Sequence, residues 1–97
     1  MIEVEKVNLN NGILYYIKGT KVLHREDGPA FLIKSNRIKK WYYNGKLHRE
    51  DGPAYIYPNI SKEWYINGVL YNKEGWFQAL NEEQKIKALY SEYFIRD

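Results

Sequence analysis

Cysteine is absent from the 97-residue chain, and this absence removes several kinds of function. A disulfide scaffold, a thiolate metal site and a cysteine nucleophile are excluded, and a reducing compartment is favoured. No apolar run approaches the roughly 20 residues of a membrane span. The first ten residues alternate acidic and apolar side chains, without the basic patch and apolar stretch of a signal peptide. We therefore expect a cytoplasmic protein that does not enter a membrane.

The residues that are present favour β structure. Ten Tyr and three Trp contribute much of a hydrophobic fraction of 44%, and aromatic residues are enriched in strands. A chain of this length has room for one modest core. We therefore expect residues 1–97 to form a single, mainly β domain.

The net charge of +3 is unevenly distributed along the chain. Residues 1–10 sum to −1, residues 11–50 to +6 (nine basic, three acidic), and residues 51–97 to −2 (five basic, seven acidic). The basic middle segment is either a solvated surface or a face for an acidic partner, of which nucleic acid is one class.

An internal repeat determines the expected architecture. Residues 23–30, Leu-His-Arg-Glu-Asp-Gly-Pro-Ala, recur without change at residues 47–54, a period of 24. A second phrase, Trp-Tyr-Tyr-Asn-Gly at 41–45, returns as Trp-Tyr-Ile-Asn-Gly at 64–68, and a fainter copy stands at 15–19. The unit therefore consists of an aromatic strand, a turn, a short strand, an acidic loop with Gly-Pro, and another strand.

The Asn-Gly pairs predict the register of two hairpins, because a type I′ turn needs positive φ at both central positions. The facing pairs are then Tyr43–Lys46, Tyr42–Leu47, Trp41–His48, Ile66–Val69, Tyr65–Leu70 and Trp64–Tyr71. Alternation along a strand puts Tyr42, Leu47, Tyr65 and Leu70 on one face, and Trp41, Tyr43, His48, Trp64, Ile66 and Tyr71 on the other. Both faces are partly apolar, so neither is assigned to solvent.

The repeat stops at residues 70–77, where a third acidic loop would fall. A short helix is expected over 73–80, and a second helix capped by Asn81 and Gln84. Its apolar face is Ile86, Leu89, Tyr90, Tyr93 and Phe94. We therefore predict an α+β, mainly β fold: an antiparallel meander of repeated β-hairpins at 1–71, with a helical cap on the sheet at 72–97.

The first residues predict an edge strand. Residues 2–7 alternate apolar and charged side chains, and an unpaired edge is open to a second copy of the chain. A homodimer is therefore one expected form of the protein.

The phrase W-Y-x-N-G-x-L-H-R-E-D-G-P-A resembles the variant MORN repeats over about residues 13–80. It is most similar to the "HREDGPA" repeat proteins of bacteriophages and large DNA viruses. The resemblance implies a single-layer, twisted β-meander with an interaction role and no enzymatic activity, and some bacterial relatives are described as antitoxins. This chain departs from the pattern in having two full loops, in a first hairpin without Trp or Asn-Gly, and in lacking ordinary MORN glycine spacing.

His24 and His48, each three residues before an Asp, are the positions closest to a chemical site. Such pairs suit a divalent cation, or a base with its orienting group, and a small metal-dependent hydrolase is the corresponding function. No Ser, Thr or Cys stands beside either motif. The alternative is structural: Asp accepts amide bonds within the turn, and Arg pairs with a carboxylate of the neighbouring unit. We favour this alternative, with no catalytic residue, metal or cofactor.

The expected function is protein binding, because Trp, Tyr and Arg dominate interface hot spots. The candidate partner-binding residues are Trp41, Tyr43, His48, Arg49, Trp64, His24 and Arg25; core packing is the alternative for the aromatic ones. On the resemblance, the partner is a host enzyme or defence protein that a phage or virus inhibits, as anti-CRISPR proteins do.

The alternative function is nucleic-acid binding through the basic, aromatic segment 34–49. Its candidate residues are Lys34, Arg37, Lys39, Lys40 and Lys46. These lysines also suit strand edges, where charge discourages aggregation.

Overall fold

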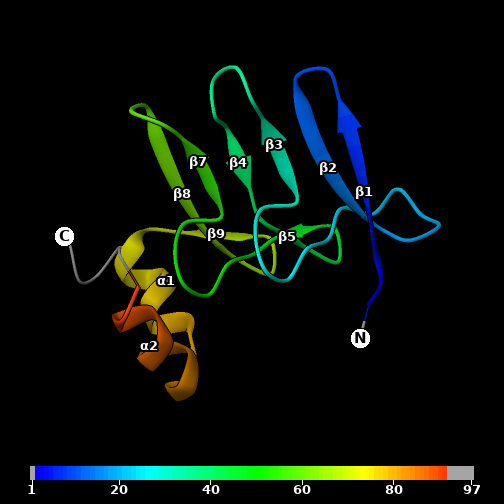
Figure 1. Cartoon of the computed structure of the whole chain (residues 1–97). Coiled ribbons are helices and arrows are strands. Elements are labelled where there is room, and N and C mark those ends of the chain that lie inside the picture. The colour runs from blue at the N-terminus through cyan, green and yellow to red at the C-terminus, as the bar shows by residue number, and fades with distance from the viewer. Residues whose placement is uncertain (1, 92–97) are drawn as a thin grey trace.

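The computed structural model describes residues 2–91, which form a β-hairpin array followed by two helices (Figure 1). The strands are β1 Val4–Leu9, β2 Gly12–Ile17, β3 Phe31–Ile33, β4 Lys39–Lys40, β5 Tyr42–Tyr43, β6 Lys46–Leu47, β7 Tyr55–Tyr57, β8 Ser61–Ile66 and β9 Val69–Tyr71. The helices are α1 Lys73–Ala79 and α2 Glu82–Leu89.

The main sheet is antiparallel, with strand order β1-β2-β3-β4-β7-β8-β9, and β5 and β6 form a separate hairpin. Neighbours in this sheet follow one another along the chain except at the β4–β7 step, where the β5–β6 hairpin is inserted. The predicted fold class, a mainly β meander of hairpins followed by helices, is therefore confirmed.

The hairpins form two rows, because the two halves of each long strand belong to different hairpins. In β8, Glu63 lies opposite Tyr55 of β7, whereas Trp64 lies opposite Tyr71 of β9. The upper row contains the hairpins β1–β2, β3–β4 and β7–β8, and the lower row contains the hairpin of residues 16–23, β5–β6 and β8–β9 (Figure 1). We number the units by their long strands: β2 is in the first unit, β4 and β5 in the second, and β8 in the third.

The two Asn-Gly turns have the backbone conformation that the sequence predicts. Asn44 and Gly45 have φ of 49° and 78°, and the values at Asn67 and Gly68 are 48° and 81°. The predicted pairs are confirmed in both hairpins, since β5 faces β6 and β8 faces β9 in the expected register. The His48 amide also donates to the Trp41 carbonyl at 3.0 Å.

One face of the third unit is covered by α1. Trp64 is buried with Trp76 and Leu80 of this end of the chain and with Ala88 of α2, and the Trp64 and Trp76 ring centres lie 4.8 Å apart. Ile66, Tyr71 and Phe77 pack against this cluster. The sequence left both faces of the hairpins unassigned. In the third unit, the face that carries Trp64 is covered, and the exposed Leu70 lies on the opposite face.

The helices begin where predicted, but they cover the sheet differently. The capping box at α2 is confirmed, with Asn81 and Gln84 exchanging side chain-to-backbone bonds. The expectation that the apolar face of α2 caps the sheet is wrong for its described part, because Ile86, Leu89 and Tyr90 are exposed. Trp76 of α1 takes that role, because α1 directly follows β9. Tyr93 and Phe94, predicted on the same face, lie outside the described residues.

β1 forms an edge of the main sheet, as the alternation of residues 2–7 predicts, although it begins at Val4. The carbonyl of Glu3, the residue before β1, accepts the Lys18 amide at 3.0 Å. Neither α1 nor α2, the helices of the described residues, is long and apolar enough to cross a membrane.

Candidate functional site

Each histidine of the repeated motif joins one unit to the next. His24 Nδ1 accepts the backbone N–H of Asn44 at 2.9 Å, and His48 Nδ1 accepts that of Asn67 at 3.0 Å. Both acceptors serve the first residue of an Asn-Gly turn. His24 is fully buried. Without it, the Asn44 amide would lose a buried hydrogen-bond acceptor.

The second ring nitrogen of each histidine faces a glutamate of its own loop. Since Nδ1 accepts, a neutral ring carries its proton on Nε2. From there His48 donates to Glu50 Oε2 at 2.8 Å, and His24 faces Glu26 Oε2 at the longer distance of 3.4 Å. Both nitrogens of each ring are therefore used within the repeat. Within residues 2–91, no group of three or more His, Asp or Glu side chains is placed to hold a metal ion.

Arg25 folds back over its own loop. Its Nε donates to Asp27 Oδ1 at 3.0 Å and its Nη1 to the Pro29 carbonyl at 3.1 Å. Its guanidinium carbon lies 4.1 Å from the centre of the Tyr15 ring. A Cβ atom at Gly28 would lie 2.9 Å from this guanidinium, so a larger residue there would displace the arginine side chain.

Arg49 repeats this arrangement. It donates to Asp51 at 2.7 Å and to the Pro53 carbonyl at 3.0 Å, and its guanidinium carbon lies 3.9 Å from the Trp41 ring centre. The expected pairing of each arginine with a carboxylate of the neighbouring unit is wrong for these bonds. The carboxylate two residues along the chain is closer, and the planar guanidinium stacks on the ring beneath it.

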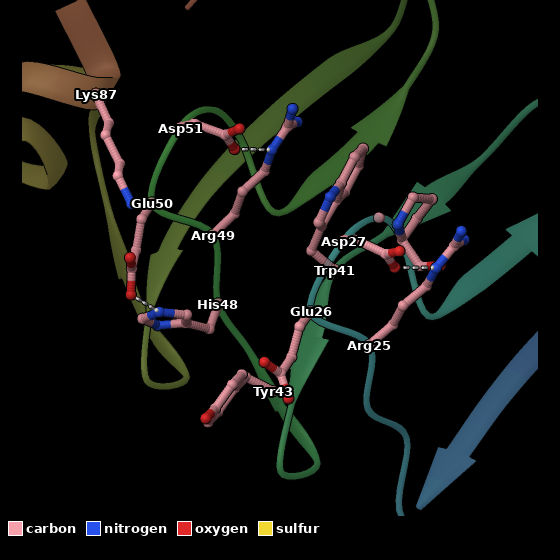
Figure 2. Close-up of a pocket in the computed structure, with 12 residues that line it drawn as sticks. Arg25, Glu26, Asp27, Trp41, Tyr43, His48, Arg49, Glu50, Asp51 and Lys87 are labelled. Atoms are coloured by element: carbon pink, nitrogen blue, oxygen red, sulfur yellow. Dashed lines mark hydrogen bonds and ion pairs between the residues drawn. The ribbon is translucent and has the colours of Figure 1, made fainter. Parts of the chain in front are cut away.

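A groove of about 610 Å³ lies between the two acidic loops (Figure 2). Trp41 and Tyr43 of the second unit line it, and Lys87 reaches it from α2 (Figure 2). The remaining lining residues are Arg25, Glu26, Asp27, Gly28, Pro29, His48, Arg49, Glu50 and Asp51. The two loops thus form facing sides of one surface depression.

Tyr43 lies between the two histidines. Its ring centre is 4.6 Å from that of His24 and 5.9 Å from that of His48. The side chain is nevertheless 40% exposed. Tyr43 is therefore a large aromatic side chain of the groove that is exposed to solvent.

The structure brings together five of the seven predicted partner-binding residues. Those that line the groove are Trp41, Tyr43, His48, Arg49 and Arg25. His24 is fully buried beneath Tyr43, and Trp64 is buried in the core under α1, so neither is presented to a partner. The sequence did not indicate Lys87 or the four loop carboxylates as groove residues, because that requires knowing that the loops face each other and that α2 folds back toward them.

The five predicted nucleic-acid-binding residues are dispersed. Lys34 and Arg37 lie exposed in the turn between β3 and β4, at the tip of the upper row, whereas Lys46 follows the turn at the tip of a lower-row hairpin. Lys39 and Lys40 are neighbours in one strand and therefore point to opposite faces. Lys40 lies over the Phe31 and Tyr55 rings, 4.8 and 5.1 Å from their centres. These five side chains do not form one basic surface.

Two tyrosines on the face opposite Trp41 and Trp64 have shifted acidities. Burial raises the pKa of Tyr42 above its usual value of 10.0. Burial also raises the pKa of Tyr65, and the Glu63 carboxylate that accepts its hydroxyl at 3.0 Å raises this pKa further. Both phenols therefore stay protonated near neutral pH and are unsuited to act as bases there.

Comparisons of this chain with family models, with curated proteins and with solved structures each found no match.

Proposed function

We propose that this chain is a protein-binding module that holds a partner protein in the groove between its two acidic loops. The observation that carries the proposal is Tyr43, a large ring that lines this groove and is 40% exposed. Tyrosine supplies a rigid, amphipathic contact area and is enriched at interface hot spots.

The fold does not require an aromatic residue at this position. Aligning the repeated phrases places Ile17 and Ile66 at the position of Tyr43 in the first and third units. Ile17 ends β2 and Ile66 ends β8, and each directly precedes the turn of its hairpin. The aromatic ring of Tyr43 is therefore available for a role other than the packing of the repeat.

The charges around the groove favour a protein over a nucleic acid. The carboxylates of Glu26, Asp27, Glu50 and Asp51 surround it and are substantially exposed. Arg25 and Arg49 are each paired with an aspartate of their own loop. Phosphates are held by cations with unpaired donors and are repelled by carboxylates.

The resemblance of residues 13–80 to the HREDGPA repeat proteins supports a more specific partner. On that resemblance, the partner is a host enzyme or defence protein, and the module inhibits it by occupying its surface without chemistry. A second function, nucleic-acid binding, rests on Lys34 and Arg37, which are exposed together at the β3–β4 turn.

A pull-down with a matched pair of variants tests the proposal. The tagged chain is incubated with nuclease-treated host lysate in moderate salt, and retained proteins are identified by mass spectrometry. Tyr43→Ile removes the ring but installs the residue that the repeat carries at this position elsewhere. Tyr90→Ile is the control, because Tyr90, the C-cap residue of α2, is exposed and does not line the groove.

We expect one dominant protein with the unaltered chain and with Tyr90→Ile, and a loss of at least about tenfold with Tyr43→Ile, as removal of a hot-spot ring produces. Equal capture by all three proteins would exclude the groove. Retention of nucleic-acid-dependent material alone would favour the second function.

A further inference from the structure

The lower-row hairpins are joined by the same backbone bond at each step. The Gly45 amide, in the turn of the second unit, donates to the Leu23 carbonyl of the first unit at 2.8 Å. The Gly68 amide, in the turn of the third unit, donates to the Leu47 carbonyl of the second at 2.7 Å. Each leucine at this position of the repeat thus receives the turn of the unit that follows.

Two further contacts accompany each bond. The turn glycine packs on the residue before the leucine: a Cβ atom at Gly45 would lie 3.3 Å from Val22, and one at Gly68 would lie 3.7 Å from Lys46. In addition, the residue two positions after the leucine donates to the aromatic strand of the next unit, as Arg25 N–H does to the Tyr42 carbonyl at 3.1 Å. The chain therefore contains two copies of one docking geometry.

Leu70 is the third residue of this series and lies at the end of the array. It faces Tyr65 in the β8–β9 hairpin, one pair beyond the Ile66–Val69 pair that closes the two-residue turn. Hydrogen-bonded and non-bonded pairs alternate in antiparallel strands, so the N–H and C=O of Leu70 point away from β8. The Leu70 side chain is 57% exposed and that of Val69 53%, whereas Leu23 and Leu47 are half-buried.

A hollow of about 600 Å³ borders this edge. It is lined in part by Leu70, Tyr71 and Asn72, the residues that lead from β9 into α1. Tyr71 replaces the histidine of the earlier units and packs on the core. The edge therefore keeps the leucine carbonyl and the apolar contact of the docking geometry, and it lacks the histidine acceptor.

We infer that the Val69–Leu70 edge docks a β-hairpin of a partner protein, whose Asn-Gly turn donates its glycine N–H to the Leu70 carbonyl. This inference rests on the proposed protein-binding function but uses a surface separate from the groove. The occupant is assigned from the two internal copies, in which such a turn covers the same leucine.

A second copy of the chain is a poor source of this hairpin. Its two Asn-Gly turns are already engaged, through Gly45 and Gly68, with its own leucine carbonyls. The corresponding turn of its first unit lies between Ile17 and Val22, whose backbone groups are bonded, and it is two residues longer than an Asn-Gly turn, so it does not have the docking geometry. The hairpin must therefore come from another protein.

The experiment uses a synthetic hairpin with the sequence of residues 64–71, Trp-Tyr-Ile-Asn-Gly-Val-Leu-Tyr, closed by a disulfide between two cysteines added at its ends. The peptide is titrated into the ¹⁵N-labelled full chain and followed by amide chemical shifts. We expect shifts centred on residues 69–72. A control peptide with N-methylglycine at the turn lacks the donor N–H and is expected to bind at least about tenfold more weakly, because the Leu70 carbonyl then has no donor.

Two matched variants of the protein locate the contact. Leu70→Asp places a charge on the docking edge and is expected to abolish the shifts. Ile60→Asp alters a side chain that is 67% exposed at the other end of the third unit, and it is expected to leave them unchanged. Tyr43→Ile, which tests the groove, is also expected to leave them unchanged, so the inference and the proposed function can fail separately.

Three outcomes would overturn the inference. The first is an absence of shifts at millimolar peptide, and the second is a set of shifts centred elsewhere. The third is concentration-dependent dimerisation of the unaltered chain in sedimentation that Leu70→Asp abolishes, because the occupant would then be a second copy.

Discussion

At the scale of single residues, the identical motifs are explained by connections between units. Each histidine accepts an amide of the next turn through Nδ1, and each arginine covers an aromatic ring, which is Tyr15 of β2 for Arg25 and Trp41 between β4 and β5 for Arg49. An acceptor and a planar cation must recur at the repeat period if the units are to stack alike. These contacts give a structural reason for the motif to recur unchanged within the chain.

Replacing the histidines tests this role. We expect His24→Ala and His48→Ala each to destabilise the fold by about 1–3 kcal/mol, since a turn amide loses its acceptor. The effect is expected to be larger at His24, which is fully buried and would leave a cavity, than at the slightly exposed His48. Urea denaturation monitored by tryptophan fluorescence gives both values.

The same measurement separates structure from metal binding. We expect the free energy of unfolding of the unaltered chain to be insensitive to Zn²⁺ and to a chelator. A stabilisation by Zn²⁺ that either alanine variant removes would instead indicate a metal site at these histidines.

At the scale of elements, the turns determine how units meet. Gly45 and Gly19 have nearly equal φ, 78° and 80°, so alanine at either position has the same backbone strain, about 1–2 kcal/mol. A Cβ atom at Gly45 would also press on Val22 of the first unit, whereas one at Gly19 meets nothing within 4 Å. We therefore expect Gly45→Ala to lower the unfolding free energy more than Gly19→Ala. Equal losses of unfolding free energy in chemical denaturation would show that this contact between units does not affect stability.

Elements that depend on local chemistry could be predicted from the sequence. The Asn-Gly turns, the register of β5–β6 and β8–β9, and the capping box at Asn81 each follow from a few neighbouring residues. The separation of β5 from β4 was not predicted, because it depends on Trp41, whose backbone N–H donates to the Ala54 carbonyl and whose carbonyl accepts the His48 amide, and the Ala54 contact is not encoded by neighbouring residues.

The candidate site was predictable only in the part that depends on neighbouring residues. Its aromatic and basic residues stand out in the repeated phrases, and five of them line the groove. The burial of His24 and Trp64 and the presence of Lys87 depend on contacts between units and with the helices, which no local pattern encodes.

At the scale of the whole molecule, the two ends of the array are closed by different means. At the first unit, Glu3 supplies the carbonyl that holds the Lys18 amide, where a preceding histidine would stand in a longer array. At the third unit, the Trp76 indole N–H of α1 donates to the Arg49 carbonyl at 2.8 Å. One face of the β8–β9 hairpin is thereby covered, and the Val69–Leu70 edge of this hairpin stays exposed. Terminal units of repeat proteins commonly need such atypical caps.

If α1 is the cap, then Trp76 should carry much of the stability of the array. Trp76 is fully buried against Trp64, so Trp76→Ala is expected to cost about 3–5 kcal/mol and to expose the end of the sheet. Leu89→Ala, on the exposed face of α2, is expected to change the unfolding free energy by about 0.5 kcal/mol or less. Chemical denaturation of the two variants beside the unaltered chain gives the comparison. Similar losses for both variants would mean that α2 shares the capping role.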